Sequence, residues 1–479
     1  MTAASSTEDS ASPSFKTTTS SATTRTASTR GISEGLHPDP SVRAGRGVPG
    51  PTHRSNTAAG RRTNRAKITM GPVFGARCTK ITKMQRRAKG AALILPQRVG
   101  VWFIGARGSV ATTAITGAAG FAAGLIGPTG LVTALEPLVR APLPRFEDLI
   151  FGGHELTDAP LLKRAKLLVD EGVIPPSLPA AVAKSLDEAN ANIRPGISME
   201  VPPKRPMEAI HRVQEDLRNF RSAHGLARVV VINVSSTEPP IQPHPAHSDL
   251  GALREALEQE HMVLSISSLY AYAAMDSGCP FVDFTPSPGA RLPALQALAR
   301  EHAVPHAGRD GKTGETLVKS ALAPMFASRA LRVRSWTGMN VLGGGDGAAL
   351  AEPERARSKL ESKGLGLEAM LGYDVESPVR IDYVRDRGEW KTAWDRISFE
   401  GFLGTRMQMH FIWEGCDSAL AAPLVLDLAR LTAYAHTRGQ KGALVPLAFF
   451  FKDPLGTTEH RLDRQFAMLC EWLTDLEDR

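Results

Sequence analysis

Short apolar runs that end in glycine or in small polar residues recur along the first two thirds of the chain. The clearest lie at 98–104, 146–156, 227–233 and 279–284, and a shorter run follows at 302–308. Apolar runs of this length between turn residues are typical of buried parallel strands. Segments with a helical pattern separate them, at 111–126, 159–192 and 253–274. This alternation predicts an α/β fold with a largely parallel, doubly wound sheet.

The pattern changes after residue 310. Apolar positions at helical spacing predict a helix over 313–328, with a kink at Pro324. Residues 378–384 and 399–413 alternate between apolar and polar side chains, which predicts a second, more open sheet whose size suits a subunit contact. A long apolar helix is expected over 417–437, and a buried aromatic strand over 445–454 ends on Lys452. Lys452, at the end of this aromatic strand, is either part of a functional site or an edge lysine whose ammonium group extends to solvent.

A glycine-containing turn follows the first strand. Gly105 permits a tight turn, Gly108 lets the backbone approach a phosphate, and Ala111 can pack helix against strand. The order strand, turn, small-residue helix favours nucleotide binding, with a glycine-rich turn of any α/β domain as the alternative. The candidate cofactor contacts in this turn are Gly105, Ala106, Arg107, Gly108, Ser109 and Val110.

Polar residues also follow the strand over 227–233. Ser235, Ser236 and Thr237 come directly after it, at the carboxyl edge where open α/β sheets bind ligands. Capping of the next helix is the alternative explanation for these hydroxyl groups. His154, at the end of the second strand, is more simply explained as a structural hydrogen-bonding residue.

The stretch 308–347 combines two lysines with two glycine-containing turns. Lys312 precedes the expected helix and Lys319 lies about two turns inside it, so an anion could meet both ammonium groups and the helix N-terminus. An ordinary solvated helix explains the same pattern equally well. Residues 338–347 are expected to form a loop that approaches a ligand closely, and 357–363 form either part of a site or a charged surface.

Charge is distributed unevenly along the chain. Residues 1–90 hold 16 Lys and Arg against 4 Asp and Glu, a balance of +12 against +8 for all 479 residues, so residues 91–479 carry −4. The first 90 residues are rich in Ser, Thr, Arg and Pro, which predicts a disordered tail; its roles as a dispensable extension, a targeting segment or a nucleic-acid contact stay open. The ordered part, mildly acidic, is expected to bind no nucleic acid.

The four cysteines form no C-x-x-C pair, which indicates a reducing compartment, taken here as the cytoplasm, and no metal site built on cysteine. No apolar run approaches the roughly 18 to 20 residues that span a bilayer, so no membrane partner is expected.

The order of motifs resembles the myo-inositol-1-phosphate synthase family over residues 97–470. The resemblance rests on the turn at 105–111, FGGHEL at 151–156, VVVINVSSTE at 229–238, PFVDFTPSPG at 280–289, GRDGKTGETLVKS at 308–320, MNVLGGGDG at 339–347, RSKLESK at 357–363 and FFFKDP at 449–454. The chain departs from the family in its first loop, commonly GWGGNNG, and in LGGGDG where the family has LGNNDG. These departures indicate a divergent branch.

The resemblance implies an NAD-dependent isomerase that cyclises glucose 6-phosphate to inositol 1-phosphate. It implies a Rossmann-like domain over 91–309, completed by 420–479, and an inserted α+β catalytic and tetramerisation domain over 310–419. By resemblance, the catalytic residues are Lys319, Lys363, Lys452 and Asp310, with Asp310 also near the nicotinamide. The substrate-binding candidates are Lys312, Asn340, Leu342, Gly343, Gly344 and Asp346.

Two other functions stay open at this stage. One is an ordinary NAD(P)-dependent dehydrogenase of a small hydroxy or amino acid, and the other is a non-catalytic binding protein with a basic tail. The choice between NAD and NADP is also open. In NAD-binding folds an acidic residue about 20 positions after the first glycines contacts the ribose. No clear candidate stands there, and Glu136 is the nearest weak one. A requirement for a divalent or monovalent cation is equally open.

Overall fold

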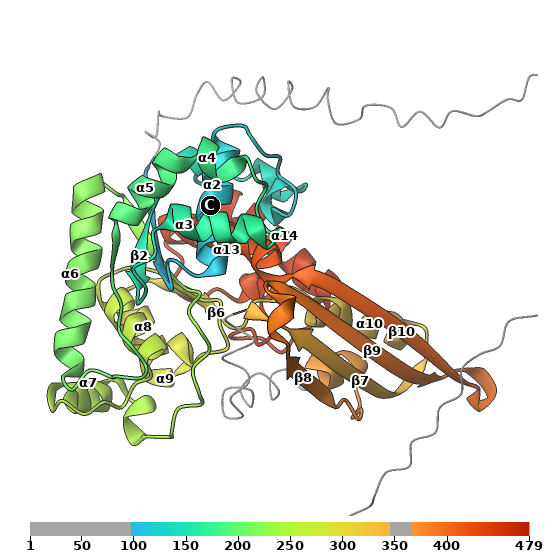
Figure 1. Cartoon of the computed structure of the whole chain (residues 1–479). Helices are drawn as coiled ribbons and strands as arrows, with labels where there is room; N and C mark the ends of the chain where they lie inside the picture. Colours follow the sequence, from blue (N-terminus) through green and yellow to red (C-terminus); the bar gives the residue numbers. More distant parts are fainter. Residues whose placement is uncertain (1–96, 345–365, 479) are drawn as a thin grey trace, which may run out of the picture. The chain divides into compact units, whose positions relative to one another are not determined.

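A computed structural model of the chain describes residues 97–344 and 366–478 (Figure 1). The predicted basic tail, and Asp346 and Lys363 among the candidate site residues, lie outside this part of the chain. The described residues form one sheet with helices on both faces and a second sheet with a helix packed against it.

The first sheet is parallel throughout and has seven strands. Its strand order is β11-β6-β5-β4-β1-β2-β3. The first six strands reproduce the order 3-2-1-4-5-6 of dinucleotide-binding folds, which confirms the expected doubly wound sheet. The strands are β1 (Val99–Ile104), β2 (Leu149–Glu155), β3 (Ile193–Pro195), β4 (Arg228–Asn233), β5 (Phe281–Asp283), β6 (Pro305–Gly308) and β11 (Gly442–Ala443).

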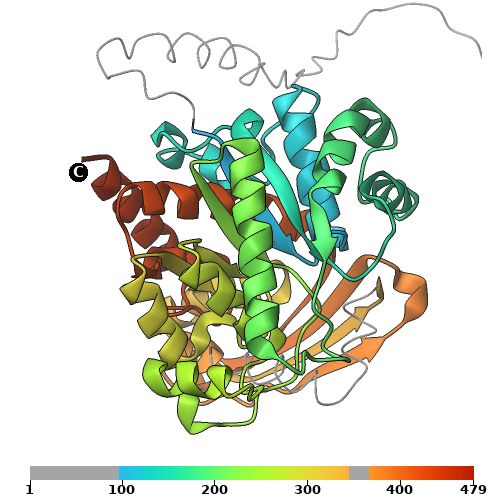
Figure 2. The same cartoon turned by 90° about the vertical axis from the view of Figure 1, so that its left-hand side faces the viewer.

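Two hydrophobic cores lie on the two faces of this sheet. Val101 and Phe103 of β1 point into one core, and Trp102 and Ile104 into the other, so every position of this strand is buried. The first core holds α2 (Ser109–Ala122), α3 (Leu161–Asp170), α4 (Leu178–Ala181), α5 (Ala183–Ala191), α13 (Asp417–Thr437) and α14 (Leu462–Asp478). The second holds α6 (Pro206–His224), the long green helix in Figure 2, with α7 (Leu250–Glu258), α8 (Ile266–Asp276) and α9 (Pro293–Glu301).

The prediction of one continuous helix over 253–274 is wrong. Two helices, α7 and α8, replace it, because Ser265 caps α8 by accepting a hydrogen bond from Ser268 N at 3.2 Å. Short 3-10 helices connect other elements, at η1 (Val132–Ala134), η2 (Leu138–Arg140), η3 (Phe146–Asp148), η4 (Pro245–His247), η5 (Gly289–Arg291), η6 (Arg385–Arg387), η7 (Phe402–Gly404) and η8 (Val445–Phe450).

The second sheet has the strand order β10-β9-β7-β8, with β7 and β8 parallel and the other pairs antiparallel. Its strands are β7 (Arg332–Leu342), β8 (Val379–Tyr383), β9 (Trp390–Glu400) and β10 (Arg406–Cys416), and α10 (Glu315–Ser328), with Pro324 inside it, packs on one face (Figure 1). The single strand expected over 399–413 is therefore wrong. Glycines at 401 and 404 turn the chain, and a hairpin results.

Two further expectations about this half are also wrong. Residues 338–342 belong to β7 rather than to a loop, because β8 and β9 pair with them on both sides. The aromatic run at 445–450 forms the 3-10 helix η8 instead of a strand.

The C-terminal part of the chain returns to the first sheet. Helix α13 packs along α2, and β11 extends the sheet beside β6. Among the described helices, only α13 is long and apolar enough to cross a membrane, but 72% of its apolar window is buried inside the protein, as in a core helix.

Candidate active site

The turn after β1 is built for close contact with an anion. Gly105 has a φ of +87°, and its amide and that of Ala106 donate to the carbonyl of His154 at 3.0 and 3.1 Å. A Cβ atom on Gly105 would lie 3.0 Å from Ser235 Cα, so a side chain would strain this turn. No side chain caps the N-terminus of α2 at Gly108. The positive end of this helix is thus available for a phosphate group.

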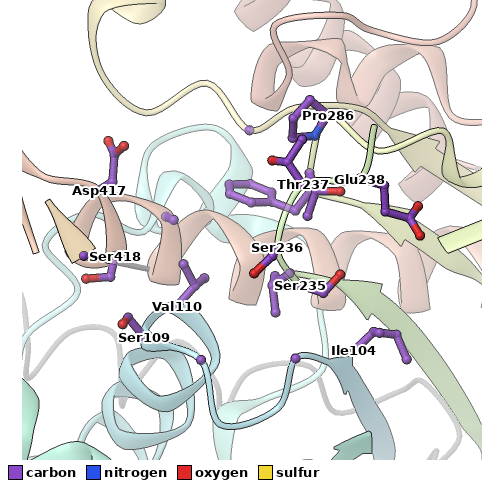
Figure 3. Close-up of a pocket in the computed structure, with 18 of the residues that line it drawn as sticks. Ile104, Ser109, Val110, Ser235, Ser236, Thr237, Glu238, Pro286, Asp417 and Ser418 are labelled. Atoms are coloured by element: carbon purple, nitrogen blue, oxygen red, sulfur yellow. The ribbon is translucent and has the colours of Figure 1, made fainter. Parts of the chain in front are cut away.

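A cavity of about 440 Å³ lies in front of this turn, at the carboxyl ends of β1 and β4. The order of strands reverses between β1 and β4, which is where such sheets bind ligands. Figure 3 draws Ser109 and Val110 in the first turn of α2, opposite Asp417 and Ser418 of α13. The candidate residues that line the cavity are Gly105, Gly108, Ser109, Val110, Ser235, Ser236, Thr237, Asp310, Leu342, Gly343, Gly344 and Lys452.

Two candidates in the turn do not line the cavity. Ala106 is fully buried in the first core. The Arg107 guanidinium donates to the carbonyl of Thr157 at 2.5 Å and to Asn190 Oδ1 at 3.2 Å, on the outer side of the turn. Their contribution to the site is therefore through the backbone of the turn.

Glu155, at the end of β2, is a cavity residue that the sequence did not reveal. Its carboxylate accepts from the backbone amides of Arg107 at 2.8 Å and Leu156 at 2.7 Å. In dinucleotide-binding folds, an acidic residue at this strand end contacts the adenosine ribose. The segment between α2 and β2 is long here, so Glu155 lies well beyond the usual interval of about 20 residues. Glu136 instead pairs with Arg140 on the surface.

His154 is held on both ring nitrogens. Nδ1 accepts from Trp102 Nε1 at 2.9 Å, which leaves Nε2 to donate to Asp216 Oδ2 at 3.0 Å. Burial lowers the pKa of His154, in keeping with a neutral ring. The histidine thus has the structural role that the sequence favoured.

Side chains of the second sheet and of α13 close the cavity on its far side. Glu389 accepts from Ser109 Oγ at 2.6 Å and from Ser418 Oγ at 3.0 Å. Lys391, a further lysine that the sequence did not single out, pairs with Asp417 at 3.3 Å. The sequence did not predict that Lys391 faces the cavity, because alternation of apolar and polar residues alone does not define the bounds of β9. Within residues 97–344 and 366–478, no group of three or more His, Cys, Asp or Glu is arranged to hold a metal ion.

Lys452 reaches this cavity through backbone pairing between distant segments. The Lys452 amide donates to the Asp310 carbonyl at 2.7 Å, and the Lys312 amide donates to the Phe450 carbonyl at 2.9 Å. Gly311 and Phe451 form an antiparallel bridge between them. The Lys452 ammonium group consequently lies 2.9 Å from Asp310 Oδ1, with 9% and 4% of the two side chains exposed. An ion pair so shielded from water is strong and well oriented.

A second cavity of about 10 Å³ adjoins the first at Lys452, which lines both. Lys312, Lys319 and His460 line it as well. The Lys312 ammonium group donates to Gln465 Oε1 of α14, and burial lowers its pKa to about 7. Two predicted lysines thus lie beside the cofactor cavity rather than in its wall, and Asn340 is buried on β7 beneath them.

The stability of the protein is expected to depend on the ionisation of Lys312. The folded state releases this proton near pH 7, whereas the unfolded chain keeps it to about 10.5, so the unfolded state binds more protons between these values. Between about pH 7 and pH 10.5, the free energy of unfolding of the wild type should therefore rise with pH relative to that of Lys312→Met. Urea denaturation at several pH values measures this difference. A constant difference would contradict it, and Lys441→Met, which changes an exposed lysine, serves as control.

The fold, the glycine turn and the cavity at the reversal of strand order define a dinucleotide-dependent enzyme. A family model described as myo-inositol-1-phosphate synthase, an NAD-binding family, matches residues 99–474. The chain belongs to this family. Its cofactor is NAD, and the tight glycine turn at Gly105, the uncapped α2 N-terminus and Glu155 fit the pyrophosphate and ribose of that cofactor.

Individual relatives agree with this family. Inositol-3-phosphate synthase 1 of Bacteroides thetaiotaomicron is 34% identical over 406 residues, which cover 78% of this chain and 93% of the relative. The human inositol-3-phosphate synthase 1 is 30% identical over 61% of this chain and 55% of its own length. The crystal structure of inositol-3-phosphate synthase from Caenorhabditis elegans has the same fold, with a TM-score of 0.71 at 23% identity, over 80% of this chain and 86% of that one.

Proposed function

We propose that this protein cyclises D-glucose 6-phosphate to 1L-myo-inositol 1-phosphate, as an inositol-3-phosphate synthase in inositol biosynthesis. When bound in the cofactor cavity, NAD would supply hydride transfer at C5 of the sugar in both directions, so the reaction has no net redox change. The observation that carries the proposal is the shielded Lys452–Asp310 pair at the junction of the cofactor cavity and the smaller lysine-lined cavity. The family and the relative from Bacteroides thetaiotaomicron support it by their names.

Lys452 is assigned to proton transfer at the C5 oxygen. Oxidation at C5 releases the hydroxyl proton, and the final reduction needs a proton on the same oxygen, so one group beside C5 can accept and return it. Lys452 would accept this proton as the neutral amine and return it as the ammonium group, and Asp310, 2.9 Å away, orients the side chain. A base then removes a C6 proton to give an enolate, C6 of the enolate attacks the C1 aldehyde to close the ring, and the C1 alkoxide that results takes up a proton. A positive charge on a side chain with little solvent exposure stabilises the oxyanions of these steps.

Other positive groups complete the assignment. Lys391, oriented by Asp417, supplies a second ammonium group at the cavity wall. Lys363 is assigned to the C1 oxygen by its motif alone, since it lies outside the described residues. The phosphate is assigned to the backbone after Leu342, where Gly343 and Gly344 line the cavity. Lys312 is assigned to it by its motif alone, because Lys312 lines the adjoining smaller cavity.

Product analysis tests the function. Full-length protein with glucose 6-phosphate and a catalytic amount of NAD should form inositol phosphate. The product is detected as phosphate that periodate releases from the cyclised product but not from residual glucose 6-phosphate, and it is identified by phosphorus NMR. Accumulation of NADH in proportion to substrate, without cyclised product, would instead indicate an ordinary dehydrogenase. A variant lacking residues 1–83 should turn over glucose 6-phosphate at the rate of the full chain. If the protein were instead a nucleic-acid-binding protein that acts through its tail, neither form would produce inositol phosphate, and the deletion would abolish binding.

We propose further that the protein is a homotetramer in the cytoplasm. A row of apolar side chains crosses the face of the second sheet opposite α10: Ile412, Trp394 and Met339 are paired across β10, β9 and β7 and are 70%, 38% and 36% exposed. Such a row on a sheet face favours contact with another subunit. The free cysteines Cys279, Cys416 and Cys470 are consistent with a reducing compartment.

Substitution on this face should dissociate the assembly. Trp394→Asp combined with Ile412→Asp places two carboxylates where the proposed contact is apolar, and sedimentation velocity should then record a smaller species than the wild type. Val139→Asp is the matched control, because Val139 is 42% exposed on η2, outside the second sheet. An unchanged sedimentation coefficient for the double variant would contradict the assignment of this face.

A further inference from the structure

Asp283, the last residue of β5, carries a buried carboxyl group that the proposed reaction does not use. Only 2% of the residue is exposed. Its Oδ1 atom accepts hydrogen bonds from Asn233 Nδ2 at 3.2 Å, from Thr285 N at 3.1 Å and from Thr285 Oγ1 at 2.9 Å. Its Oδ2 atom is buried and has no hydrogen-bond partner among the described residues. It lies against η5 instead, so closely that a Cβ atom on Gly289 would overlap it.

The described donors to Asp283 are all uncharged, and the charged groups that act on it are Arg309 and Glu238. The Arg309 guanidinium is bound elsewhere, because it pairs with Asp453 at 2.7 Å and donates to the carbonyl of Pro286. A buried carboxylate without a paired cation is costly, and protonation removes that cost. Burial accordingly raises the pKa of Asp283 to about 7. The contacts of Asp283 therefore favour the uncharged acid, with the proton on Oδ2.

The hydrogen bonds of Asp283 continue to the wall of the cofactor cavity. Asn233 Oδ1 accepts from Ser235 N at 3.2 Å and from Ser235 Oγ at 2.7 Å. Asn233 Nδ2 also donates to Thr285 Oγ1 at 3.1 Å. Ser235 and Thr285 line the cavity, whereas Asp283 and Asn233 lie behind them. The carboxyl group of Asp283 thus joins the ends of β4 and β5 beneath the cavity wall.

This part of the wall belongs to the nicotinamide half of the cofactor. The turn at Gly105 and the carboxylate of Glu155, at the ends of β1 and β2, fit the pyrophosphate and the adenosine ribose. The ends of β4 and β5 lie on the other side of β1 in the sheet. Bound NAD would therefore extend from β2 across β1 towards the ends of β4 and β5.

A second connection runs from Asp283 to Lys452. Thr285, bonded to Asp283, accepts through its carbonyl from the Asp310 amide at 3.0 Å. Asp310 pairs with the Lys452 ammonium group at 2.9 Å. Gly308 of β6 is paired with Asp283 in the sheet, and a Cβ atom on Gly308 would lie 3.2 Å from Asp283 Cβ. The segment that leads from β6 to Asp310 is thus packed directly on Asp283.

We infer that Asp283 is a positioning residue: as an uncharged acid, it fixes the ends of β4 and β5 against the nicotinamide half of NAD and, through Asp310, the placement of Lys452. It touches neither cofactor nor substrate and acts through Asn233 and Thr285. Its role in NAD binding follows from the family, whereas its effect on turnover rests on the proposed function.

Two substitutions test this role. Asp283→Asn keeps the shape of the side chain and the acceptor oxygen but cannot ionise, whereas Asp283→Ala removes the bonds to Asn233 and Thr285. Below about pH 7, calorimetric titration should give the Asn variant the NAD affinity of the wild type and the Ala variant an affinity at least about tenfold weaker. Asp475→Asn, which alters an exposed aspartate of α14, is the matched control and should leave NAD affinity unchanged.

The dependence of NAD affinity on pH distinguishes the uncharged acid from simple packing. Ionisation of Asp283 above about pH 7 places an uncompensated negative charge behind the site of an anionic cofactor. Between about pH 6 and about pH 9, the wild type should therefore lose about tenfold in NAD affinity relative to Asp283→Asn, because NAD binds more tightly to the form with the uncharged acid. Both proteins share their other titrating groups, so the ratio of the two affinities reports Asp283 alone. A ratio that does not change with pH would contradict the inference.

The free energy of unfolding without NAD gives an independent measurement. The folded state keeps the proton of Asp283 to about pH 7, whereas the unfolded chain releases it near 3.8, so the folded state binds more protons between these values. From about pH 5 to about pH 7, the free energy of unfolding of the wild type should therefore fall relative to that of Asp283→Asn, and it should stay level above. Urea denaturation measures the difference. A difference that is constant over the whole range would show that Asp283 is ionised in the folded protein.

Other outcomes overturn the inference. If Asp283→Asn loses as much NAD affinity as Asp283→Ala, the negative charge is required and the uncharged role is wrong. If Asp283→Ala binds NAD as the wild type does, Asp283 positions nothing. If the Ala variant does not fold, the Asn variant decides, because it should fold and bind NAD, and its failure to do so contradicts the inference.

The same variants separate this inference from the proposed function. NAD titration and urea denaturation need no cyclisation, so they decide the role of Asp283 in cofactor binding even if the wild type forms no inositol phosphate. If it does form this product, kcat should fall in Asp283→Ala and be retained in Asp283→Asn. An unchanged kcat in a folded Ala variant would contradict the connection from Asp283 to Lys452.

Discussion

Lys452→Met is expected to abolish cyclisation while leaving NAD binding intact. Lys452 is the described lysine that lines both cavities, and its pairing with Asp310 orients a side chain that is only 9% exposed. The variant removes both the proton carrier and the positive charge at the C5 oxygen. General acid-base groups contribute about 100-fold to 10,000-fold, and one oxyanion-stabilising group about 100-fold to 1,000-fold, so a loss of at least about 1,000-fold in kcat follows.

The measurement is the rate of inositol phosphate formation at saturating substrate, together with an NAD titration followed by calorimetry. Lys441→Met is the matched control, because Lys441 is exposed in the loop before β11. It should keep both properties. If Lys452→Met retained a tenth or more of the wild-type kcat, the assignment of Lys452 to the C5 oxygen would be wrong.

Gly105→Ala is expected to weaken NAD binding by about 100-fold. The φ of +87° is unfavourable for alanine, and its Cβ would lie 3.0 Å from Ser235 Cα and 3.1 Å from Ser235 N. The backbone of the turn or of the Ser235 segment must therefore move, and both line the cofactor cavity. Strain of this kind costs about 1 to 3 kcal/mol, and about 1.4 kcal/mol corresponds to a tenfold change in affinity.

Gly117→Ala provides the control for Gly105→Ala. Gly117 lies within α2, and nothing occupies the space within 4 Å of a Cβ atom there. Alanine in a helix interior should raise stability by about 0.5 to 1 kcal/mol and leave NAD affinity unchanged. Calorimetric titration and thermal unfolding measure the two effects. Equal NAD affinities for Gly105→Ala and the wild type would contradict the role of the turn.

The parts of the site that the sequence could predict are those formed within one strand and the turn after it. The apolar run of β1, the glycines at 105 and 108 and the small residues of α2 are contiguous, and their local conformations follow from residue type. Ser235, Ser236 and Thr237 likewise follow β4 directly. The carboxyl ends of parallel strands meet at one edge, so these segments were expected to lie together.

Alternation was less informative in the second half of the chain. The pattern over 399–413 continues through the hairpin turn, because Phe399 and Phe411 both face α10 although they lie on different strands. Periodicity reports which face of a strand is buried, but it does not report where the chain reverses. Leu403, at the tip with a φ of +57°, gives no such signal in the sequence.

By itself, the sequence determined the parallel sheet, the nucleotide turn and the order of motifs that places the chain in its family, because these depend on local pattern. Only the tertiary structure decided which lysines meet. Pairing between Asp310 and Lys452 depends on backbone bonds between segments far apart in the chain, and the burial of Lys319 depends on Asp395 from another strand. Such contacts arise from packing between elements, and residue spacing carries no information about them.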